Sequence, residues 1–241
     1  MCLGSGKIMK LLALVPAYNE EKRIADTIGA LKSLSSVSEV VVADDCSSDD
    51  TVNEAKKAGA TVIEHKYNLG KGQSLNKALE SLEMSKYSGV ILADGDLASS
   101  AAEFKHLIEG FEQGSADMLI AGFGKPKKKG GFGLVKGLAR WAIKKYGGSE
   151  QFKTPLSGQR LLATGILKDI LPLAPGFGME VDMTLKALKA GYKVREVPTK
   201  MTHDETGRNL AGFKHRGRQF VDILKVTCKV ILRTPTLRRR T

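Results

Sequence analysis

The sequence predicts an α/β protein with a mostly parallel central sheet flanked by helices, and three observations support this prediction. From Lys10 to Ala93, short β-rich apolar runs alternate with amphipathic stretches of helical periodicity. Strands that alternate with helices in this way are typical of βαβ units, in which the strands run parallel. The 241 residues, 42% of them hydrophobic, are enough for one large domain around one substantial core.

The apolar runs give the expected strands, and the stretches between them give the expected helices. The strands are expected at residues 11–15, 39–43, 61–64, 89–93, 117–121 and 192–197. Helices are expected near 20–33, 50–58, 71–83, 181–190 and 209–232, with a further helical stretch ending at residue 146. Ligands of open parallel sheets bind beyond the carboxyl ends of the strands, so we look for a site in the segments that follow them.

The formal net charge of +12 is concentrated in the C-terminal part of the chain. Residues 207–241 carry ten Lys or Arg against the single acid Asp222. The expected helix at 209–232 is amphipathic, with Leu224 and Cys228 on its apolar side and a basic face. This balance indicates an anionic partner, either a membrane surface, a phosphorylated acceptor or a nucleic acid, and a solvated basic tail is the alternative.

Several classes of protein do not fit the sequence. The apolar runs are much shorter than the roughly 20 residues that span a bilayer, and no signal peptide opens the chain. We therefore expect a cytoplasmic protein, with peripheral contact to the inner face of the membrane through the basic helix. Three widely spaced cysteines fit neither a disulfide framework nor a zinc site. No nucleic-acid-binding motif is present, and the first strand is not followed by the glycine pattern of a Rossmann dehydrogenase.

Two acidic segments follow expected strands. Asp94-Gly95-Asp96 offers two carboxylates as hard oxygen ligands for Mg²⁺ or Mn²⁺, whose remaining positions would hold a diphosphate. A surface turn is the alternative for this segment. Asp44-Asp45 follows the second expected strand, and one carboxylate there, Asp44, could accept a hydrogen bond from a nucleobase N–H or ribose hydroxyl. The alternative for this segment is a helix N-cap formed by Ser47, Ser48 or Asp49, and both interpretations can hold. Lys71 lies between two glycines before a helix, a geometry suited to phosphate, although a plain turn competes.

The combination of these motifs resembles family 2 glycosyltransferases, especially their dolichol-phosphate-mannose-synthase-like branch. The segments that carry the resemblance are Val15-Pro16-Ala17-Tyr18-Asn19-Glu20-Glu21, Asp44-Asp45-Cys46-Ser47-Ser48-Asp49-Asp50-Thr51, Asn68-Leu69-Gly70-Lys71-Gly72, Asp94-Gly95-Asp96-Leu97 and Ser157-Gly158-Gln159-Arg160. The first four of them occur in the order and spacing of that family over about the first 120 residues. The resemblance implies a GT-A fold, a nucleoside-diphosphate-sugar donor carrying UDP or GDP, and Mg²⁺ or Mn²⁺ as cofactor.

The resemblance also implies roles for individual residues. Contacts to the nucleotide sugar are expected from Pro16, Ala17, Tyr18, Glu20, Asp44, Lys71, Asp94, Gly95 and Arg160. The metal is expected at Asp96, with His203 completing its coordination. Glu180 or Asp182 would act as general base for a hydroxyl acceptor. Two residues apart on a helix, these acids point about 200° apart, so we expect only one of them to face the site.

The resemblance divides the chain into functional parts. We expect a disordered leader at 1–9, a GT-A catalytic domain at 10–205 and a basic amphipathic helix and tail at 206–241. Within the domain, 10–122 would bind the nucleotide, 123–150 would form a flexible loop and helix, and 151–205 would bind the acceptor. The expected activity is that of a metal-dependent hexosyltransferase.

The acceptor remains open at this stage. It would be a polyprenyl phosphate or a cell-envelope glycan precursor, or alternatively a soluble phosphorylated acceptor, as in glucosyl-phosphoglycerate synthases. A basic nucleic-acid-binding protein is a remote alternative. Whether the anomeric configuration inverts and whether the chain forms a homodimer also stay open.

Overall fold

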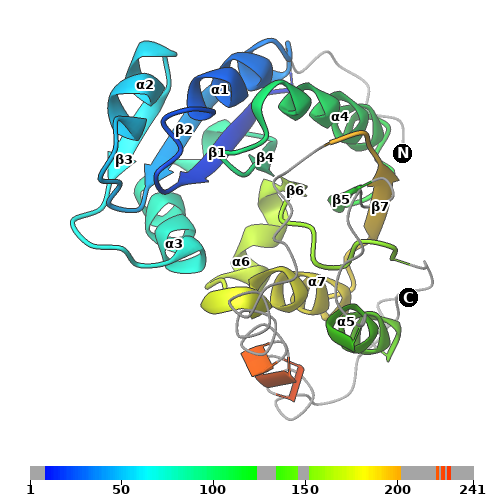
Figure 1. Cartoon of the computed structure of the whole chain (residues 1–241). Coiled ribbons are helices and arrows are strands. Elements are labelled where there is room, and N and C mark those ends of the chain that lie inside the picture. Colours follow the sequence, from blue (N-terminus) through cyan, green and yellow to red (C-terminus); the bar gives the residue numbers. More distant parts are fainter. Residues whose placement is uncertain are drawn as a thin grey trace.

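A seven-stranded sheet forms the centre of the computed structural model (Figure 1). The structure describes residues 9–123, 134–145 and 152–201, together with residues 221, 222, 224, 225, 227 and 228. In the sheet the strands follow the order β3-β2-β1-β4-β6-β5-β7. Their bounds are Leu11–Ala17 (β1), Val37–Asp44 (β2), Thr61–Glu64 (β3), Gly89–Leu92 (β4), Met118–Gly122 (β5), Arg160–Ala163 (β6) and Val194–Pro198 (β7).

Strand directions confirm the prediction of a mostly parallel sheet. Strand β6 runs antiparallel to both of its neighbours, β4 and β5, and every other neighbouring pair is parallel. The register places Ala17 of β1 opposite Asp44 of β2, and Leu14 of β1 opposite Leu92 of β4. As a result, the segments that leave β1, β2 and β4 emerge side by side at one edge of the sheet.

Helices cover both faces of the sheet (Figure 1). One face carries α1 (Ile24–Lys32), α2 (Thr51–Lys57) and α4 (Phe104–Glu112), and the other carries α3 (Lys71–Ser81), α5 (Leu134–Lys145), α6 (Leu167–Ile170) and α7 (Met179–Lys189). In the described parts of the chain, short 3₁₀ helices lie at Met84–Lys86, Ala98–Glu103, Thr164–Ile166 and Gly176–Gly178. The result is a three-layer arrangement of helices, sheet and helices.

The alternation of side chains along the strands creates two cores, one on each side of the sheet. In β1, Leu12 and Leu14 pack on the side of α3, whereas Leu11 and Val15 pack on the side of α1. All four of these side chains are fully buried. Successive residues of a strand point to opposite faces, so a strand that is covered on both sides has to be apolar throughout.

Three elements of the fold, β6, α4 and the four-residue helix α6, were not predicted from the sequence. Strand β6 has only four residues, too few for a periodicity, and it is a strand because β4 and β5 pair with it. Helix α4 was also missed, although its Phe104, Leu107 and Ile108 share one buried face. The other observed strands and α1–α3, α5 and α7 overlap the predicted ranges, with bounds that differ by a few residues.

The expected division of the chain falls partly outside the described residues. Residues 1–8, 124–133 and 146–151 of the expected loop and helix at 123–150, and most of 206–241 are not described. Near the C-terminus, two residues of the predicted apolar side of the basic helix are described. Leu224 and Cys228 are exposed, whereas the polar Thr227 is buried.

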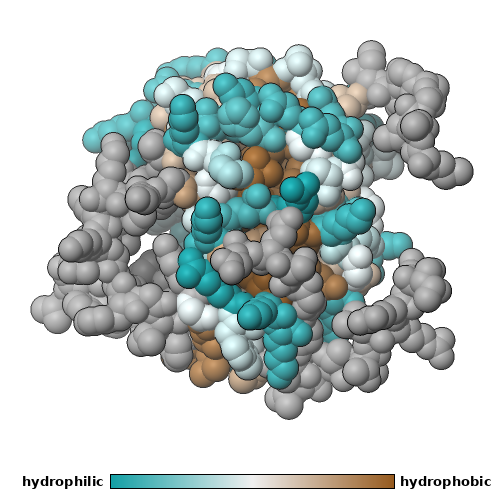
Figure 2. Space-filling model, turned by 90° about the vertical axis from the view of Figure 1, so that its right-hand side faces the viewer, coloured by the Kyte–Doolittle hydropathy of each residue, from teal (hydrophilic) through white to brown (hydrophobic). Residues whose placement is uncertain are grey.

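No helix within the described parts of the chain is long and apolar enough to cross a membrane. Figure 2 shows one side of the molecule, where hydrophobic colour is confined to patches between hydrophilic groups. Exposed large apolar side chains do occur singly among the described residues, with Tyr67 and Trp141 as examples. Single exposed apolar side chains are normal on soluble domains.

Leu14→Ala is expected to lower the free energy of unfolding by about 2–5 kcal/mol, because it removes buried methyl groups from the central strand and leaves a cavity. Urea unfolding followed by circular dichroism measures the change. Tyr67→Ala is the control, since this side chain is 70% exposed and its loss should change stability by less than about 0.5 kcal/mol. Equal effects of the two substitutions would contradict the assignment of Leu14 to the core.

Candidate active site

A pocket of about 250 Å³ lies at the edge of the sheet where β1, β2 and β4 end. Its lining consists of Pro16, Ala17, Tyr18, Glu20, Asp45, Lys71, Asp94, Gly95 and Asp96. All of these except Asp45 had been singled out from the sequence, although they come from three separate segments. The parallel register described above brings together the segments that follow β1, β2 and β4.

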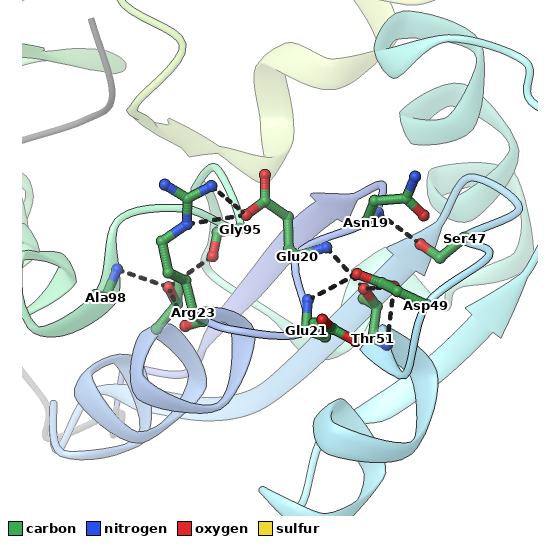
Figure 3. Close-up of polar contacts among 10 residues, drawn as sticks. Asn19, Glu20, Glu21, Arg23, Ser47, Asp49, Thr51, Gly95 and Ala98 are labelled. Carbon is green, nitrogen blue, oxygen red and sulfur yellow. Dashed lines mark hydrogen bonds and ion pairs between the residues drawn. The ribbon is translucent and has the colours of Figure 1, made fainter.

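The loop after β1 is held against the loop after β2 by hydrogen bonds (Figure 3). The backbone N–H of Asn19 donates to Ser47 Oγ at 2.9 Å, and the N–H of Glu20 donates to Thr51 Oγ1 at 2.7 Å. In return, Asn19 Oδ1 accepts from the N–H of Ser48 at 2.8 Å. Asn19 has a positive φ of 57°, a conformation that asparagine tolerates better than most residues. These contacts fix the backbone beside Tyr18 and Glu20 in the pocket wall.

Asp49 strengthens the same connection between the two loops. Its carboxylate accepts hydrogen bonds from the N–H of Glu21 at 3.2 Å and from the hydroxyl of Thr51 at 2.5 Å. Burial alone would raise the pKa of Asp49, but the hydrogen bonds from Thr51 and Glu21 outweigh it and lower the pKa. The carboxylate therefore stays ionised and keeps accepting these bonds.

The neighbouring acids Asp44 and Asp45 are both buried but have different contacts. Asp44 accepts hydrogen bonds from the N–H and hydroxyl of Ser47, at 3.0 Å and 2.5 Å. Asp45 accepts from the N–H groups of Leu69 and Gly70, at 2.7 Å and 2.8 Å, and lines the pocket. Asp44 is not among the residues that line this pocket. Alternation at the end of a strand is the signal that would have separated the two acids.

Asp94 and Lys71 form the centre of the polar wall. Lys71 Nζ lies 2.6 Å from Asp94 Oδ1, and Gln159 Nε2 donates to Asp94 Oδ2 at 2.7 Å. The Gln159 side chain also accepts from the N–H of Asp94 at 2.9 Å, so it holds both the backbone and the carboxylate of this residue. Gln159 was not assigned a role from the sequence. Its contact with Asp94 spans 65 residues of chain and depends on the pairing of β6 with β4.

Two glycines bring the start of α3 into position. Gly70 precedes the helix with a φ of 80°, a conformation that favours glycine. Gly72 is buried, and a Cβ there would lie 2.5 Å from the carbonyl oxygen of Ala174. The absence of side chains therefore lets α3 approach the segment that leads into α7, and Lys71 is carried with it.

The acids in the first turn of α7 have different surroundings, as their angular separation predicts. Glu180 Oε1 lies 3.5 Å from Lys71 Nζ. Asp182 is buried and forms an ion pair with Lys186 at 2.7 Å on the same helix. Lys186 in turn donates to the carbonyl oxygen of Pro172 at 2.6 Å. Glu180 is thus next to the polar wall of the pocket, whereas Asp182 is engaged in a contact that joins α7 to the preceding segment.

Arg160 lies in the core, and the predicted contact with a phosphate does not fit this position. Its side chain is fully buried, with Nε donating to the carbonyl oxygen of Ser157 at 3.0 Å and Nη1 to Thr184 Oγ1 at 2.9 Å. Burial lowers the pKa of Arg160 to about 10, although the charge of Glu180 opposes this shift. Consecutive residues of a strand point to opposite sides, which is why Gln159 contacts Asp94 and Arg160 contacts α7.

The chemistry of the pocket suits a divalent cation. Asp94 and Asp96 supply hard carboxylate oxygens from a loop that is fixed by Thr27, whose Oγ1 donates to the carbonyl oxygen of Gly95 at 2.8 Å. The other predicted ligand, His203, lies outside the described residues. Among the described residues, no group of three or more His, Cys, Asp or Glu side chains is arranged so that it could hold a metal ion by itself. Mg²⁺ commonly binds through one or two carboxylates together with phosphates and water, so this donor set fits such an ion.

Comparison with known proteins identifies the family. The sequence model of the family described as Glycosyl transferase family 2 matches residues 13–159, more than half of the chain. The protein belongs to glycosyl transferase family 2. This assignment confirms the resemblance found in the motifs, and all of the residues lining the pocket lie within the matched region.

Relatives of this family 2 transferase cover most of its length. It is 27% identical to the glycosyltransferase AglJ of Haloferax volcanii over 88% of this chain and 70% of AglJ. It is 24% identical to an undecaprenyl-phosphate mannosyltransferase of Micrococcus luteus over 83% of this chain and 87% of that protein.

Among solved structures, it is similar to glucosyl-3-phosphoglycerate synthase of Mycobacterium tuberculosis in complex with Mn²⁺, UDP and glucosyl-3-phosphoglycerate. The TM-score is 0.75 at 21% identity, over 95% of this chain and 82% of that one. This likeness confirms the GT-A fold. The same enzyme has also been solved with Mg²⁺ and UDP.

Gly72→Ala is expected to lower the free energy of unfolding by about 1–3 kcal/mol, because the new Cβ would meet the backbone oxygen of Ala174 and force α3 to shift. Urea unfolding measures this change. The matched control is Gly29→Ala in the interior of α1, where a Cβ would meet nothing within 4 Å. Because alanine favours helix over glycine, the control should be neutral or stabilising by up to about 1 kcal/mol. A neutral Gly72→Ala would mean that the close approach of α3 is not required.

Proposed function

We propose that this family 2 glycosyltransferase transfers a hexose from a nucleoside-diphosphate sugar, carrying UDP or GDP, to an acceptor at the pocket described above. The observation that carries the proposal is that the residues expected to contact the donor, apart from Asp44 and Arg160, line a single pocket. A nucleotide would lie against the loop at 16–20, with Asp45 in place of Asp44 as the acidic residue beside it. The UDP in the similar synthase structure supports this choice of donor.

Asp96 is proposed as the metal ligand, with Mg²⁺ or Mn²⁺ as the cofactor. The acidic pair on a fixed loop and the Mn²⁺ and Mg²⁺ of the similar synthase support this assignment. The cation supplies stabilisation of the negative charge on the departing diphosphate. His203 remains a proposed further ligand.

The roles of the chain's own residues follow from their positions. Lys71 presents an ammonium group from the first residue of α3, next to the space for the diphosphate. An acceptor oxygen forms the new bond to the anomeric carbon while the nucleoside diphosphate leaves. If that oxygen belongs to a hydroxyl group, Glu180 is the base that accepts its proton, because Asp182 is engaged by Lys186. A phosphate acceptor is already anionic and requires no base.

We propose a polyprenyl phosphate as the acceptor, reached at an anionic membrane surface. The mannosyltransferase relative, whose name specifies undecaprenyl phosphate, supports a lipid phosphate. Near the C-terminus, Val221 and Leu224 are 45% and 41% exposed, and Lys225 beside them is exposed too. Exposed apolar groups next to basic ones are typical of helices that lie on membranes. A soluble phosphorylated acceptor is the second candidate, supported by the phosphoglycerate product in the similar synthase structure.

Addition of UDP or GDP with Mn²⁺ is expected to raise the melting temperature of the protein by several degrees, and EDTA should abolish the rise, because ligands stabilise the state that binds them. Differential scanning fluorimetry with each nucleotide measures the effect. Asp96→Ala should abolish the stabilisation, whereas Asp26→Ala, which removes an exposed carboxylate from α1, should retain it. If neither nucleotide stabilises the wild type with any metal, the proposed donor site is wrong.

Anionic vesicles containing phosphatidylglycerol are expected to co-sediment with the protein, and Val221→Glu with Leu224→Glu should reduce the bound fraction several-fold. The added carboxylates would meet both the apolar layer and the anionic surface unfavourably. Tyr67→Glu is the matched control, since this side chain is also exposed but lies beyond β3. Equal binding by the double variant and the wild type would favour the soluble acceptor.

A further inference from the structure

The side chain of Lys71 lies where three separate segments of the chain come together. Lys71 begins α3, and its Nζ lies 2.6 Å from Asp94 Oδ1, in the loop after β4, and 3.5 Å from Glu180 Oε1, in the first turn of α7. Its side chain is 34% exposed and that of Glu180 is 14% exposed, so solvent screens these charges only in part. One ammonium group thus faces two carboxylates at the border of the pocket.

The surroundings of Lys71 fix this arrangement. A Cβ on Gly158 would lie 2.6 Å from Lys71 Nζ, so the glycine provides the space that the ammonium group occupies. Gln159 holds the second oxygen of Asp94 at 2.7 Å, which orients the first oxygen toward Lys71. Gly72 permits the close approach of α3 to the segment before α7. An ion pair formed by chance on the surface would lack this support from Gly158, Gln159 and Gly72.

The positive charge of Lys71 suits this position. Its Nζ lies within 3.5 Å of two carboxylate oxygens, and a lysine side chain is ordinarily protonated at neutral pH. Without this charge, Asp94 and Glu180 would leave two negative charges close together in a partly buried site, which is unfavourable.

We infer that Lys71 is a built-in counterion that neutralises Asp94 and Glu180 in the free protein and couples the binding of the divalent cation to that of the nucleoside diphosphate. The positive charge of Lys71 lowers the affinity for a divalent cation beside Asp94. A bound diphosphate gives Lys71 another negative group to contact, so the nucleotide reduces this loss of affinity. Because coupling between two ligands is reciprocal, each of them should bind more tightly when the other is present.

This inference rests on the proposed function, since it assumes that both ligands bind at this pocket, and it adds a consequence that simple donor binding does not have. A lysine that only contacts the diphosphate would leave the affinity for the cation alone unchanged when it is removed. If Lys71 only maintained the fold, its removal would weaken the binding of both ligands. If Lys71 is a counterion, its removal strengthens the binding of the cation alone and weakens the binding of the nucleotide.

The test compares Lys71→Met with wild type in two titrations by isothermal calorimetry. The first uses Mn²⁺ alone, and the second uses UDP at saturating Mn²⁺, or GDP if the wild type binds that nucleotide. Lys71→Met is expected to bind Mn²⁺ alone about tenfold more tightly and the nucleotide about tenfold more weakly. Lys71→Arg keeps the charge and should change the Mn²⁺ affinity by less than about twofold.

Two further variants make the test decisive. Lys77→Met removes an exposed lysine from the same helix and should leave both affinities unchanged, which excludes an effect of net charge. Lys71→Gln replaces Lys71→Met if the latter does not fold by circular dichroism. An unchanged or weaker Mn²⁺ affinity in the folded variant, with nucleotide binding intact in the wild type, overturns the inference alone. Absence of metal-dependent nucleotide binding in the wild type overturns the proposed function and the inference with it.

Discussion

The parallel pairing of β1 with β2 on one side and with β4 on the other is the constraint on which the site depends. In parallel strands the carboxyl ends lie at one edge of the sheet, so the loops that follow them are neighbours in space. The register fixes which residues meet, since Ala17 lies opposite Asp44 and Leu14 lies opposite Leu92. Hydrogen bonds from Asn19 and Glu20 to the loop after β2 then lock the first two segments together. The apolar side chains on both faces of β1 hold this register, because a shift by one residue would exchange the two cores.

The antiparallel strand β6 connects the two parallel parts of the sheet. It pairs with β4, next to β1, and with β5, which pairs in turn with β7. At its start, Gln159 contacts the loop with Asp94, and Arg160 contacts Thr184 of α7 on the opposite face. Thr184 also donates to the carbonyl oxygen of Glu180. A segment of two residues therefore supports both carboxylates that flank Lys71, which explains how acids from distant parts of the chain come to lie beside one ammonium group.

The electrostatic character of this site differs from that of the whole chain. The protein carries a formal charge of +12, yet the pocket is lined by Glu20, Asp45, Asp94 and Asp96, with Lys71 as the basic residue of its lining. Fixed carboxylates at the sheet edge suit a divalent cation and its diphosphate, whereas basic residues elsewhere suit an anionic surface. The acidic lining of the pocket thus supports the proposed donor that binds through a metal.

The sequence alone determined the fold class, the family and most of the pocket lining, because these depend on local patterns. Apolar runs of fixed spacing specify βαβ units, and Pro16 to Glu20, Lys71 and Asp94 to Asp96 lie in short motifs that follow strands. Only the tertiary structure decided which of two neighbouring residues faces the site. It separated Asp45 from Asp44 and Glu180 from Asp182, it buried Arg160, and it brought Gln159 to Asp94. The physical reason is that side-chain direction at a strand end, and the pairing of a four-residue strand such as β6, depend on contacts between residues far apart in the chain, which local periodicity does not contain.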